Sequence, residues 1–313
     1  MISMIVGSRG SALALRQTQM VVDAIERLNP HVKCRVEVIK TTGDRVLDKP
    51  LAKIGDKGLF VKEIEAALIA GEIDFAVHSA KDLPSEMDER LCVAAYPERE
   101  CPADALVSRN GRLADLPSGA SVGTSSLRRR AQILAARPDL KISDLRGNLD
   151  TRLRKLDEGC CDAIVLACAG LVRMGLASRI TQELTYEICL PAVGQGALAI
   201  QCRTGDSACG AVAKLDSAAT RACVTAERAL LAALGGGCQT PISALSRVVD
   251  GELVMDALVA AIDGSRIVRK SATGCIGAPD ELGKRLAKEL LDSPAKQLLD
   301  AARDGVPPNI GAA

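Results

Sequence analysis

The sequence predicts an α/β protein with two doubly wound domains and a smaller third domain of α+β type. Three observations lead to this fold class. The chain has 313 residues, which is more than one hydrophobic core usually holds. Short apolar runs alternate with longer helical patterns through the first two thirds, as in βαβ units with a mostly parallel sheet. The last third instead has the pattern of an antiparallel strand pair followed by helices.

The first domain begins with an apolar run at residues 1–6, which predicts a strand. A helical pattern follows over residues 11–28, and Ser11 is expected to cap this helix. A strand, a helix and a further strand are then expected at residues 32–40, 60–71 and 73–79, with Gly71 ending the helix. Proline and charge become denser at residues 96–104, which suggests a crossover to the second domain.

The second domain repeats this alternation. Its strands are expected at residues 120–124, 140–145 and 161–168, and its helices at 125–137 and 149–159. Residues 190–202 combine Pro and Gly with an apolar strand, and this stretch could return the chain to the first domain.

The third domain begins near Ala219 with an expected helix at residues 220–234. A strand is expected at 242–247, followed by an antiparallel pair that turns at Asp263–Gly264. The two strands of that pair are placed at 251–263 and 265–274, and the final helices at 280–292 and 294–303.

The composition argues against several classes of function. Forty basic residues balance thirty-nine acidic ones, so the protein has no net field that would attract a polyanion. Two Phe, two Tyr and no Trp argue against binding of single-stranded nucleic acid, in which bases stack on aromatic rings. The sequence contains neither a recognisable secretion signal nor an apolar run of membrane-spanning length. We therefore expect a cytoplasmic protein without a membrane or nucleic-acid partner.

The chain has twelve cysteines. In an intracellular protein they are expected to stay reduced, and none are spaced as C-x-x-C, so no metal site is predicted. Most of them are interpreted as small buried apolar side chains. Cys238 differs, because glycines 235–237 come directly before it. Its thiol could be a nucleophile, a tether, or a buried group beside a helix C-cap.

Four predicted strand-to-helix turns resemble one another. Each has hydroxyl residues or glycines at a predicted helix start and Arg or Lys close behind, at residues 7–11, 78–84, 123–130 and 145–152. Helix N-termini attract anions, and arginine offers paired donors that fit carboxylates. In doubly wound sheets such turns converge beyond the carboxyl ends of the strands. We therefore expect a site for a ligand with several negative charges.

Three features of this site leave alternatives open. Phosphate-binding glycine motifs are absent, so separate carboxylates suit the turns at least as well as phosphate does. Ser125 and Ser126 could simply cap a helix whose residues Arg128–Arg130 form a solvated face. Asp82 could pair with Lys81 or cap a helix, or it could hold N–H donors and stabilise positive charge that develops during a reaction.

Seven segments of the chain resemble the porphobilinogen deaminase family, also called hydroxymethylbilane synthase. In chain order they read GSRGSALALRQT, PLAKIGDKGLFVKEIE, HSAKDLP, VGTSSLRRRAQ, LRGNLDTRLRKL, LPAVGQGALAI and GGGCQTPI. The resemblance implies two lobes similar to periplasmic binding proteins, at residues 1–97 with 197–216 and at 98–196. It implies a third, α+β domain at 217–313 that carries the cofactor-attachment cysteine.

The resemblance also implies the reaction. Members of the family are monomeric transferases of haem and porphyrin biosynthesis. They join four porphobilinogen molecules head to tail into the linear tetrapyrrole hydroxymethylbilane and release ammonia at each addition. The chain grows on a dipyrromethane cofactor that is itself assembled from substrate.

By the same resemblance, individual residues receive roles. Cys238 would hold the cofactor through a thioether, and Asp82 would be the catalytic residue and contact the cofactor. The other cofactor-binding residues would be Ser79, Lys81, Thr124, Ser125, Ser126, Arg128 and Arg129. The substrate-binding residues would be Arg9, Ser11, Gln17, Lys53, Phe60, Arg146, Arg152, Arg173 and Gln195. No metal is implied.

Two other functions fit part of this pattern. A solute-binding or sensor module with the same two lobes would keep an Arg-lined cleft, but it would need neither Cys238 nor Asp82. A cysteine hydrolase would need a histidine base near Cys238, and only His78 could serve.

Overall fold

The computed structural model describes residues 1–45, 61–236 and 240–304. The chain divides into two compact units. Unit 1 comprises Met1–Glu100 and Gly196–Arg221, and unit 2 comprises Cys101–Gln195 and Ala222–Ala313. None of the described helices is both long enough and apolar enough to cross a membrane.

Unit 1 contains a five-stranded sheet in the order β2-β1-β3-β10-β4. Strand β1 (Ile2–Ser8) pairs in parallel with β2 (Val32–Val38) and β3 (Phe75–Ser79). Strand β10 (Leu198–Arg203) runs antiparallel between β3 and β4 (Leu91–Ala95). Four strands thus share one direction and β10 is reversed, which confirms the mostly parallel sheet.

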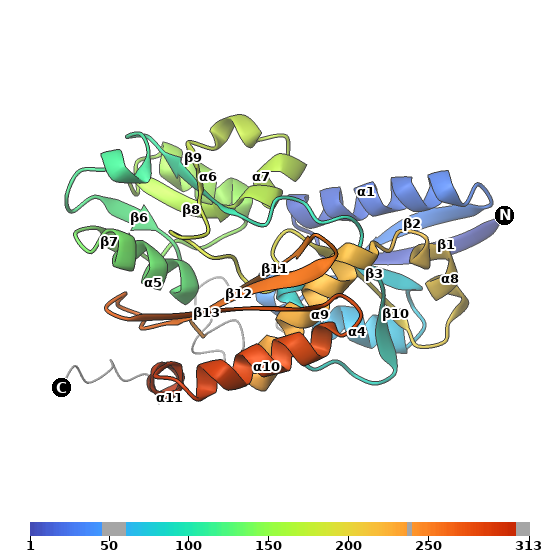
Figure 1. The fold of residues 1–313 in the computed structure, drawn as a ribbon. Helices are drawn as coiled ribbons and strands as arrows, with labels where there is room; N and C mark the ends of the chain where they lie inside the picture. The colour runs from blue at the N-terminus through green and yellow to red at the C-terminus, as the bar shows by residue number, and fades with distance from the viewer. Residues whose placement is uncertain (46–60, 237–239, 305–313) are drawn as a thin grey trace. The chain divides into compact units, whose positions relative to one another are not determined.

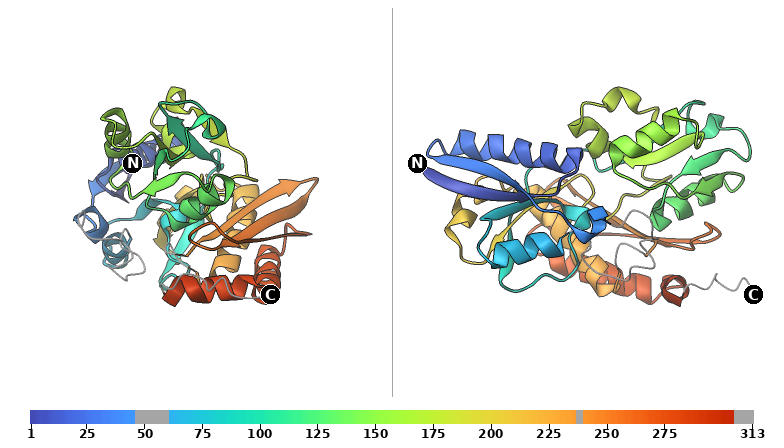
Figure 2. Two further views of the ribbon diagram at one scale, coloured as in Figure 1. Left: turned by 90° about the vertical axis from the view of Figure 1, so that its left-hand side faces the viewer. Right: turned by 180° about the vertical axis from the view of Figure 1, so that it is seen from behind.

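Helix α1 (Ala12–Leu28) extends along this sheet (Figure 2, right). Ser11 caps it as predicted, because its hydroxyl accepts the N–H of Ala14 at 3.3 Å. The buried side chains of α1, among them Val22 and Ile25, pack with Phe75 of the sheet. The other helices of unit 1 are α2 (Thr42–Arg45), α4 (Lys62–Ile69), α8 (Ser207–Ala213) and a 3₁₀ turn at Ala80–Asp82.

Unit 2 contains a second five-stranded sheet, in the order β7-β6-β8-β5-β9. Strand β6 (Ser121–Gly123) pairs in parallel with β7 (Lys141–Ser143) and β8 (Ala163–Ala167). Strand β5 (Asp104–Ser108) runs antiparallel to β8 and to β9 (Gln182–Leu184). Both sheets therefore combine three neighbouring parallel strands with one reversed strand and one further edge strand.

The helices of this part of unit 2 follow the parallel strands. They are α5 (Leu127–Ala136), α6 (Leu149–Asp157) and α7 (Cys168–Arg173), with 3₁₀ turns at Leu113–Asp115 and Ala177–Arg179. Side chains from the sheet and from α6 and α7 form one core, which includes Leu153, Ile164 and Leu171.

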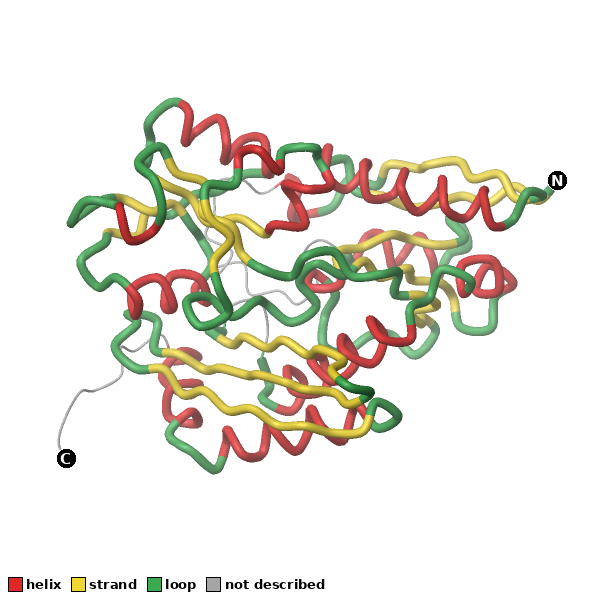
Figure 3. Tube along the Cα trace, turned by 45° about the horizontal axis from the view of Figure 1, so that its top comes forward, coloured by secondary structure: helices red, strands yellow, loops and turns green. Residues whose placement is uncertain are grey.

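The rest of unit 2 holds a separate antiparallel sheet of β11 (Ile242–Val249), β12 (Glu252–Ala260) and β13 (Ile267–Cys275). The three strands run side by side in Figures 1 and 3. The predicted turn at Asp263–Gly264 joins β12 to β13, and Gly264 has a φ of +76°, which glycine adopts readily. Helices α9 (Ala218–Ala233), α10 (Pro279–Leu291) and α11 (Ala295–Asp304) supply the apolar side chains that cover this sheet.

The observed fold confirms the α/β class, with two similar sheets and a small third sheet. Three strands were missed by the sequence analysis, namely β4, β5 and β9. Strand β5 reads DALVS and begins with a carboxylate, so its sequence resembles a loop, yet all but its last residue are buried. Helices α7 and α8 were also missed, because six and seven residues are too few to display a helical period.

Eleven cysteines lie in the described residues, and none of these is joined in a disulfide. Cys161, Cys168, Cys189, Cys202 and Cys223 are buried as expected. The expectation is wrong for Cys160 and Cys275, which are exposed, and the other four are partly buried.

Candidate active site

Two of the predicted basic turns lie at one edge of the unit 1 sheet. Strands β1 and β3 are parallel neighbours, so the turns at residues 9–11 and 80–82 follow strand ends on the same edge. Gln17 of α1 is buried, and its Nε2 donates to Ser79 Oγ at 3.3 Å. Unit 1 thereby gathers the predicted residues Arg9, Ser11, Gln17, Ser79, Lys81 and Asp82.

Asp82 is the last residue of the 3₁₀ turn after β3. Its side chain is partly buried, and it makes no hydrogen bond or ion pair with any residue that the structure describes. Within the described chain, therefore, neither the pairing with Lys81 nor the capping role is formed. A carboxylate held in this way can accept N–H groups from a ligand without first breaking an internal contact.

His78 lies on β3 and is buried. Its Nε2 is 2.9 Å from Gln201 Oε1 on the neighbouring strand β10. Burial lowers the pKa of His78 to about 4, although the hydrogen bond to Gln201 acts in the opposite direction. An imidazole with this pKa is a poor general base at pH 7, which counts against the cysteine hydrolase.

We expect His78 to make the protein less stable as the pH falls from 6.5 to 4. The native pKa of about 4 lies below the ordinary value of 6.5, so the unfolded chain binds more protons in this window and stability rises with pH. The full difference between these two pKa values corresponds to about 3 kcal/mol of unfolding free energy. Urea unfolding of wild type and His78→Gln between pH 4 and 7 measures it.

The variant His31→Gln is the control for this experiment, because His31 is exposed. It should keep the wild-type pH dependence, whereas His78→Gln should lose the steep part between pH 4 and 6.5. Identical slopes in wild type and His78→Gln would contradict the assignment.

The other two predicted turns, together with α7, lie at one edge of the second sheet. Strands β6, β7 and β8 are parallel neighbours, and α5, α6 and α7 follow them. Ser126 caps α5 by accepting the N–H of Arg129 at 3.4 Å, and Asn148 caps α6 by accepting the N–H of Thr151 at 3.0 Å. This edge gathers the predicted residues Thr124, Ser125, Ser126, Arg146, Arg152 and Arg173.

The arginines of α6, of α7 and of the turn before α6 are held by their surroundings. Arg152 Nε donates to the carbonyl of Gly147 at 2.8 Å, and Arg146 Nε lies 3.3 Å from Asp144 Oδ2. Arg173 is buried on α7. These contacts restrict the guanidinium groups, which favours binding of a carboxylate because less side-chain entropy is lost.

A buried carboxylate, Asp104 at the start of β5, holds both Arg128 and Arg129. Arg128 Nη1 donates to Asp104 Oδ2 at 2.6 Å, and Arg129 Nη2 donates to Oδ1 at 2.7 Å. Gln195 Nε2 also donates to Oδ1, at 3.0 Å. Asp104 is fully buried and each arginine is 6% exposed. The interpretation as a solvated face is thus wrong for these two arginines and holds only for Arg130, which is exposed.

The electrostatics of this cluster follow from its composition. Burial alone would raise the pKa of Asp104, but the guanidinium groups of Arg128 and Arg129 outweigh burial and hold the pKa well below its usual range. Two cations and one anion leave one net positive charge in a region with little water. Such a cluster attracts a further anion more strongly than the same charges would in bulk solvent.

Asp104 was missed by the sequence analysis. Its two arginine partners are 24 and 25 residues away, and no spacing motif links them. Three predicted residues, Lys53, Phe60 and Cys238, lie outside the described residues. All the other predicted residues fall into two groups, one within each unit.

Two family models match this chain and agree with the motifs. The family model "Porphobilinogen deaminase, dipyromethane cofactor binding domain" matches residues 4–211. The model "Porphobilinogen deaminase, C-terminal domain" matches residues 221–292. Among solved structures, a TRAP periplasmic solute binding protein from Desulfovibrio salexigens aligns with a TM-score of 0.41 at 12% identity, covering 69% of this chain and 72% of that chain.

Curated relatives match over nearly the full length. The porphobilinogen deaminase of Desulforudis audaxviator is 52% identical over 96% of this chain and 98% of that protein. That of Roseiflexus castenholzii is 52% identical over 95% and 98%, and that of Syntrophobacter fumaroxidans is 50% identical over 94% and 96%. The chain therefore belongs to the porphobilinogen deaminase family, a family of transferases in porphyrin biosynthesis that use a dipyrromethane cofactor.

Proposed function

We propose that this chain performs the reaction of its family through the two groups of residues described above. In that reaction four porphobilinogen molecules are joined head to tail into hydroxymethylbilane, and one ammonia is released at each addition. Each porphobilinogen carries an acetate and a propionate, so substrate and product bring many carboxylates to the protein. Helix N-termini, hydroxyls and arginines at the two sheet edges are suited to bind these groups.

The chemistry of the residues fits a dipyrromethane cofactor. The turn after β6 leads into α5, which carries the arginines of the positively charged cluster around Asp104, and this charge suits the cofactor's acid groups. Within the turn, Ser125 Oγ donates to the carbonyl of Leu145 at 2.6 Å and Thr124 Oγ1 accepts the N–H of Ser126 at 3.2 Å. When bound, the cofactor supplies the pyrrole carbon to which the first substrate is joined. The attachment to Cys238 is supported by the GGGCQTPI motif, since this residue lies outside the described part of the chain.

Asp82 is proposed to stabilise the positive charge that develops on the substrate. When the C–N bond of the protonated aminomethyl group breaks, ammonia leaves with the bonding electrons, and the remaining cation is delocalised onto the pyrrole nitrogen. A carboxylate that accepts the pyrrole N–H lowers the energy of this cation. The electron-deficient carbon then bonds to the free α-carbon of the terminal pyrrole, which loses its proton. The observation that carries this proposal is the carboxylate of Asp82, which has no partner among the described residues.

The other residues are proposed to bind or to position. Ser79, Lys81, Ser126, Arg128 and Arg129 would hold the cofactor, while Arg9, Ser11, Lys53, Phe60, Arg146, Arg152 and Arg173 would hold the substrate or the growing chain. Gln17 and Gln195 are better described as positioning residues. Gln17 holds Ser79, and Gln195 holds the carboxylate of Asp104.

We further propose that the chain folds into three domains, at residues 1–97 with 197–216, at 98–196 and at 217–313. The protein is proposed to be a cytoplasmic monomer without nucleic-acid or membrane partners.

A stoichiometric assay tests the proposed function. Purified protein mixed with porphobilinogen should release four ammonia molecules for each linear tetrapyrrole, with product mass and ammonia measured in the same sample. Binding of porphobilinogen without release of ammonia would favour a solute-binding or sensor module and contradict the proposal.

A further inference from the structure

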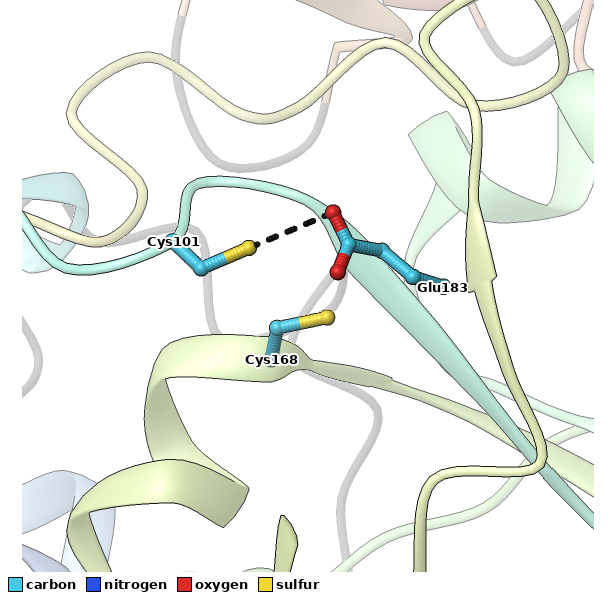
Figure 4. A group of neighbouring side chains, drawn as sticks. All are labelled: Cys101, Cys168 and Glu183. Atoms are coloured by element: carbon cyan, nitrogen blue, oxygen red, sulfur yellow. Dashed lines mark hydrogen bonds between the residues drawn. The ribbon is translucent and has the colours of Figure 1, made fainter.

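Two thiols and a carboxylate that were assigned no role in the active site meet in unit 2. Cys101, Cys168 and Glu183 each offer one donor atom, and the three atoms lie within 4.8 Å of one another. The Sγ of Cys101 is 3.5 Å from Glu183 Oε1. Figure 4 shows the ends of the three side chains facing one another. Within the part of the chain that the structure describes, this is the only such group of three.

We propose that Cys101, Cys168 and Glu183 bind a divalent metal ion of the zinc type. Zinc binds thiolate and carboxylate ligands, and soft thiolates select it over magnesium or calcium. Three protein ligands leave the fourth tetrahedral position for water. The cysteine spacing alone predicts no metal site, and this proposal replaces that prediction.

The distances suit a tetrahedral ion. Bond lengths of about 2.3 Å to sulfur and about 2.1 Å to oxygen place a sulfur and an oxygen ligand about 3.6 Å apart, and two sulfur ligands about 3.8 Å apart. The observed separation of 3.5 Å between Cys101 Sγ and Glu183 Oε1 already matches. The remaining pairs are separated by at most 4.8 Å, so the two sulfur atoms must approach by no more than about 1 Å, and Cys168 Sγ and the Glu183 oxygen by no more than about 1.2 Å.

The sheet holds the backbone of all three ligands in place. Strand β5 pairs with both β8 and β9. Cys168 directly follows β8, Glu183 lies in β9 and Cys101 lies shortly before β5. The N–H of Cys168 also donates to the carbonyl of Ala103 at 3.0 Å. Because these strands are joined by backbone hydrogen bonds, the ligands are preorganised before any metal binds.

The burial and charge of the cluster suit a cation. Cys168 is buried, Cys101 is partly buried and Glu183 is exposed, which leaves the ion a path from solvent. A divalent ion displaces the protons of both thiols when it binds, and its charge offsets that of the two thiolates and of Glu183.

A bound metal would link the chain entering β5, the edge strand β9 and the start of α7. Helix α7 ends at Arg173, one of the proposed substrate-binding residues. We therefore infer a structural role, in which the ion fixes the helix that carries Arg173. The metal itself takes no part in the proposed condensation.

The test uses the full chain, reduced with a non-thiol reductant, and Co²⁺ as a spectroscopic probe. Two thiolate ligands in a tetrahedral site should give sulfur-to-cobalt charge-transfer absorption and intense visible bands, and Zn²⁺ should remove both. Cys101→Ser and Cys168→Ser should weaken binding at least about 100-fold, because even a change behind a ligand costs about 10- to 100-fold. Glu183→Gln should weaken it at least about tenfold.

Matched control variants show whether these particular thiols and this carboxylate bind the metal. Cys275→Ser and Glu187→Gln change exposed residues and should bind Co²⁺ as wild type does. Cys92 Sγ and Cys209 Sγ in unit 1 lie 3.9 Å apart, so Cys209→Ser tests the competing thiol pair. Bands that persist in Cys101→Ser, or that disappear only in Cys209→Ser, would overturn the proposal.

Two further outcomes are decisive. A wild-type protein without any thiolate-to-cobalt absorption would overturn the proposal directly. If Cys168→Ser does not fold because residue 168 is buried, Cys101→Ser and Glu183→Gln test the site instead, since both residues are more accessible. Zinc should also raise the Tm of wild type and should leave that of Cys101→Ser unchanged.

Discussion

Replacing Asp82 with Asn should lower turnover by at least about 100- to 1000-fold, the usual cost of removing one preorganised group that stabilises developing charge. The free energy of unfolding should change little, because Asp82 makes no hydrogen bond or ion pair with any described residue. The substitution keeps the shape of the side chain and removes only its charge. Steady-state turnover of porphobilinogen and urea unfolding of the same preparation measure the two quantities.

The control for this prediction is Glu89→Gln. Glu89 is an exposed carboxylate in the segment between the Asp82 turn and β4, and its replacement should leave turnover unchanged. Wild-type turnover in Asp82→Asn would remove Asp82 from the mechanism. A large loss of stability in Asp82→Asn would instead show that the residue supports the fold.

Replacing Asp104 with Asn should lower the free energy of unfolding by about 3–5 kcal/mol, the cost of breaking a buried ion pair. The variant leaves Arg128 and Arg129, each only 6% exposed, next to each other without a counter-ion. Both guanidinium groups would then have to be buried without compensation for their charge. Urea unfolding at pH 7 measures the difference.

An exposed pair of the same residue types provides the comparison. Asp88 and Arg90 are joined at 2.6 Å near the surface, where water and salt screen the charges. Asp88→Asn should therefore have a much smaller effect than Asp104→Asn. Equal effects would contradict the view that burial makes the Asp104 cluster important.

The sequence predicted the fold well where local signals were strong. Ser11 at the start of α1 and the Asp263–Gly264 turn both lie where predicted, because capping and turn formation depend on neighbouring residues. Strand β5 was missed for the opposite reason. Its first residue is a carboxylate that is compatible with the interior only because α5 supplies two arginines.

The candidate site likewise has parts that depend on neighbouring residues and parts that depend on the complete fold. The basic turns could be located from their residues, since topology places such turns at the carboxyl edge of a parallel sheet. The contacts of Arg128 and Arg129 could not be located in this way, because Asp104 reaches them only through the folded sheet. Cys101, Cys168 and Glu183 are separated by 67 and 15 residues, so their proximity also requires the fold.

The proposed tetrapyrrole grows on a dipyrromethane attached to Cys238. The intact mass of purified, active protein, followed by mapping of the modified peptide, tests this attachment. We expect a mass above that of the chain by two linked pyrrole units, located on Cys238 and absent from Cys238→Ser. Active protein with the unmodified mass, or an adduct on a different cysteine, would rule out the attachment to Cys238.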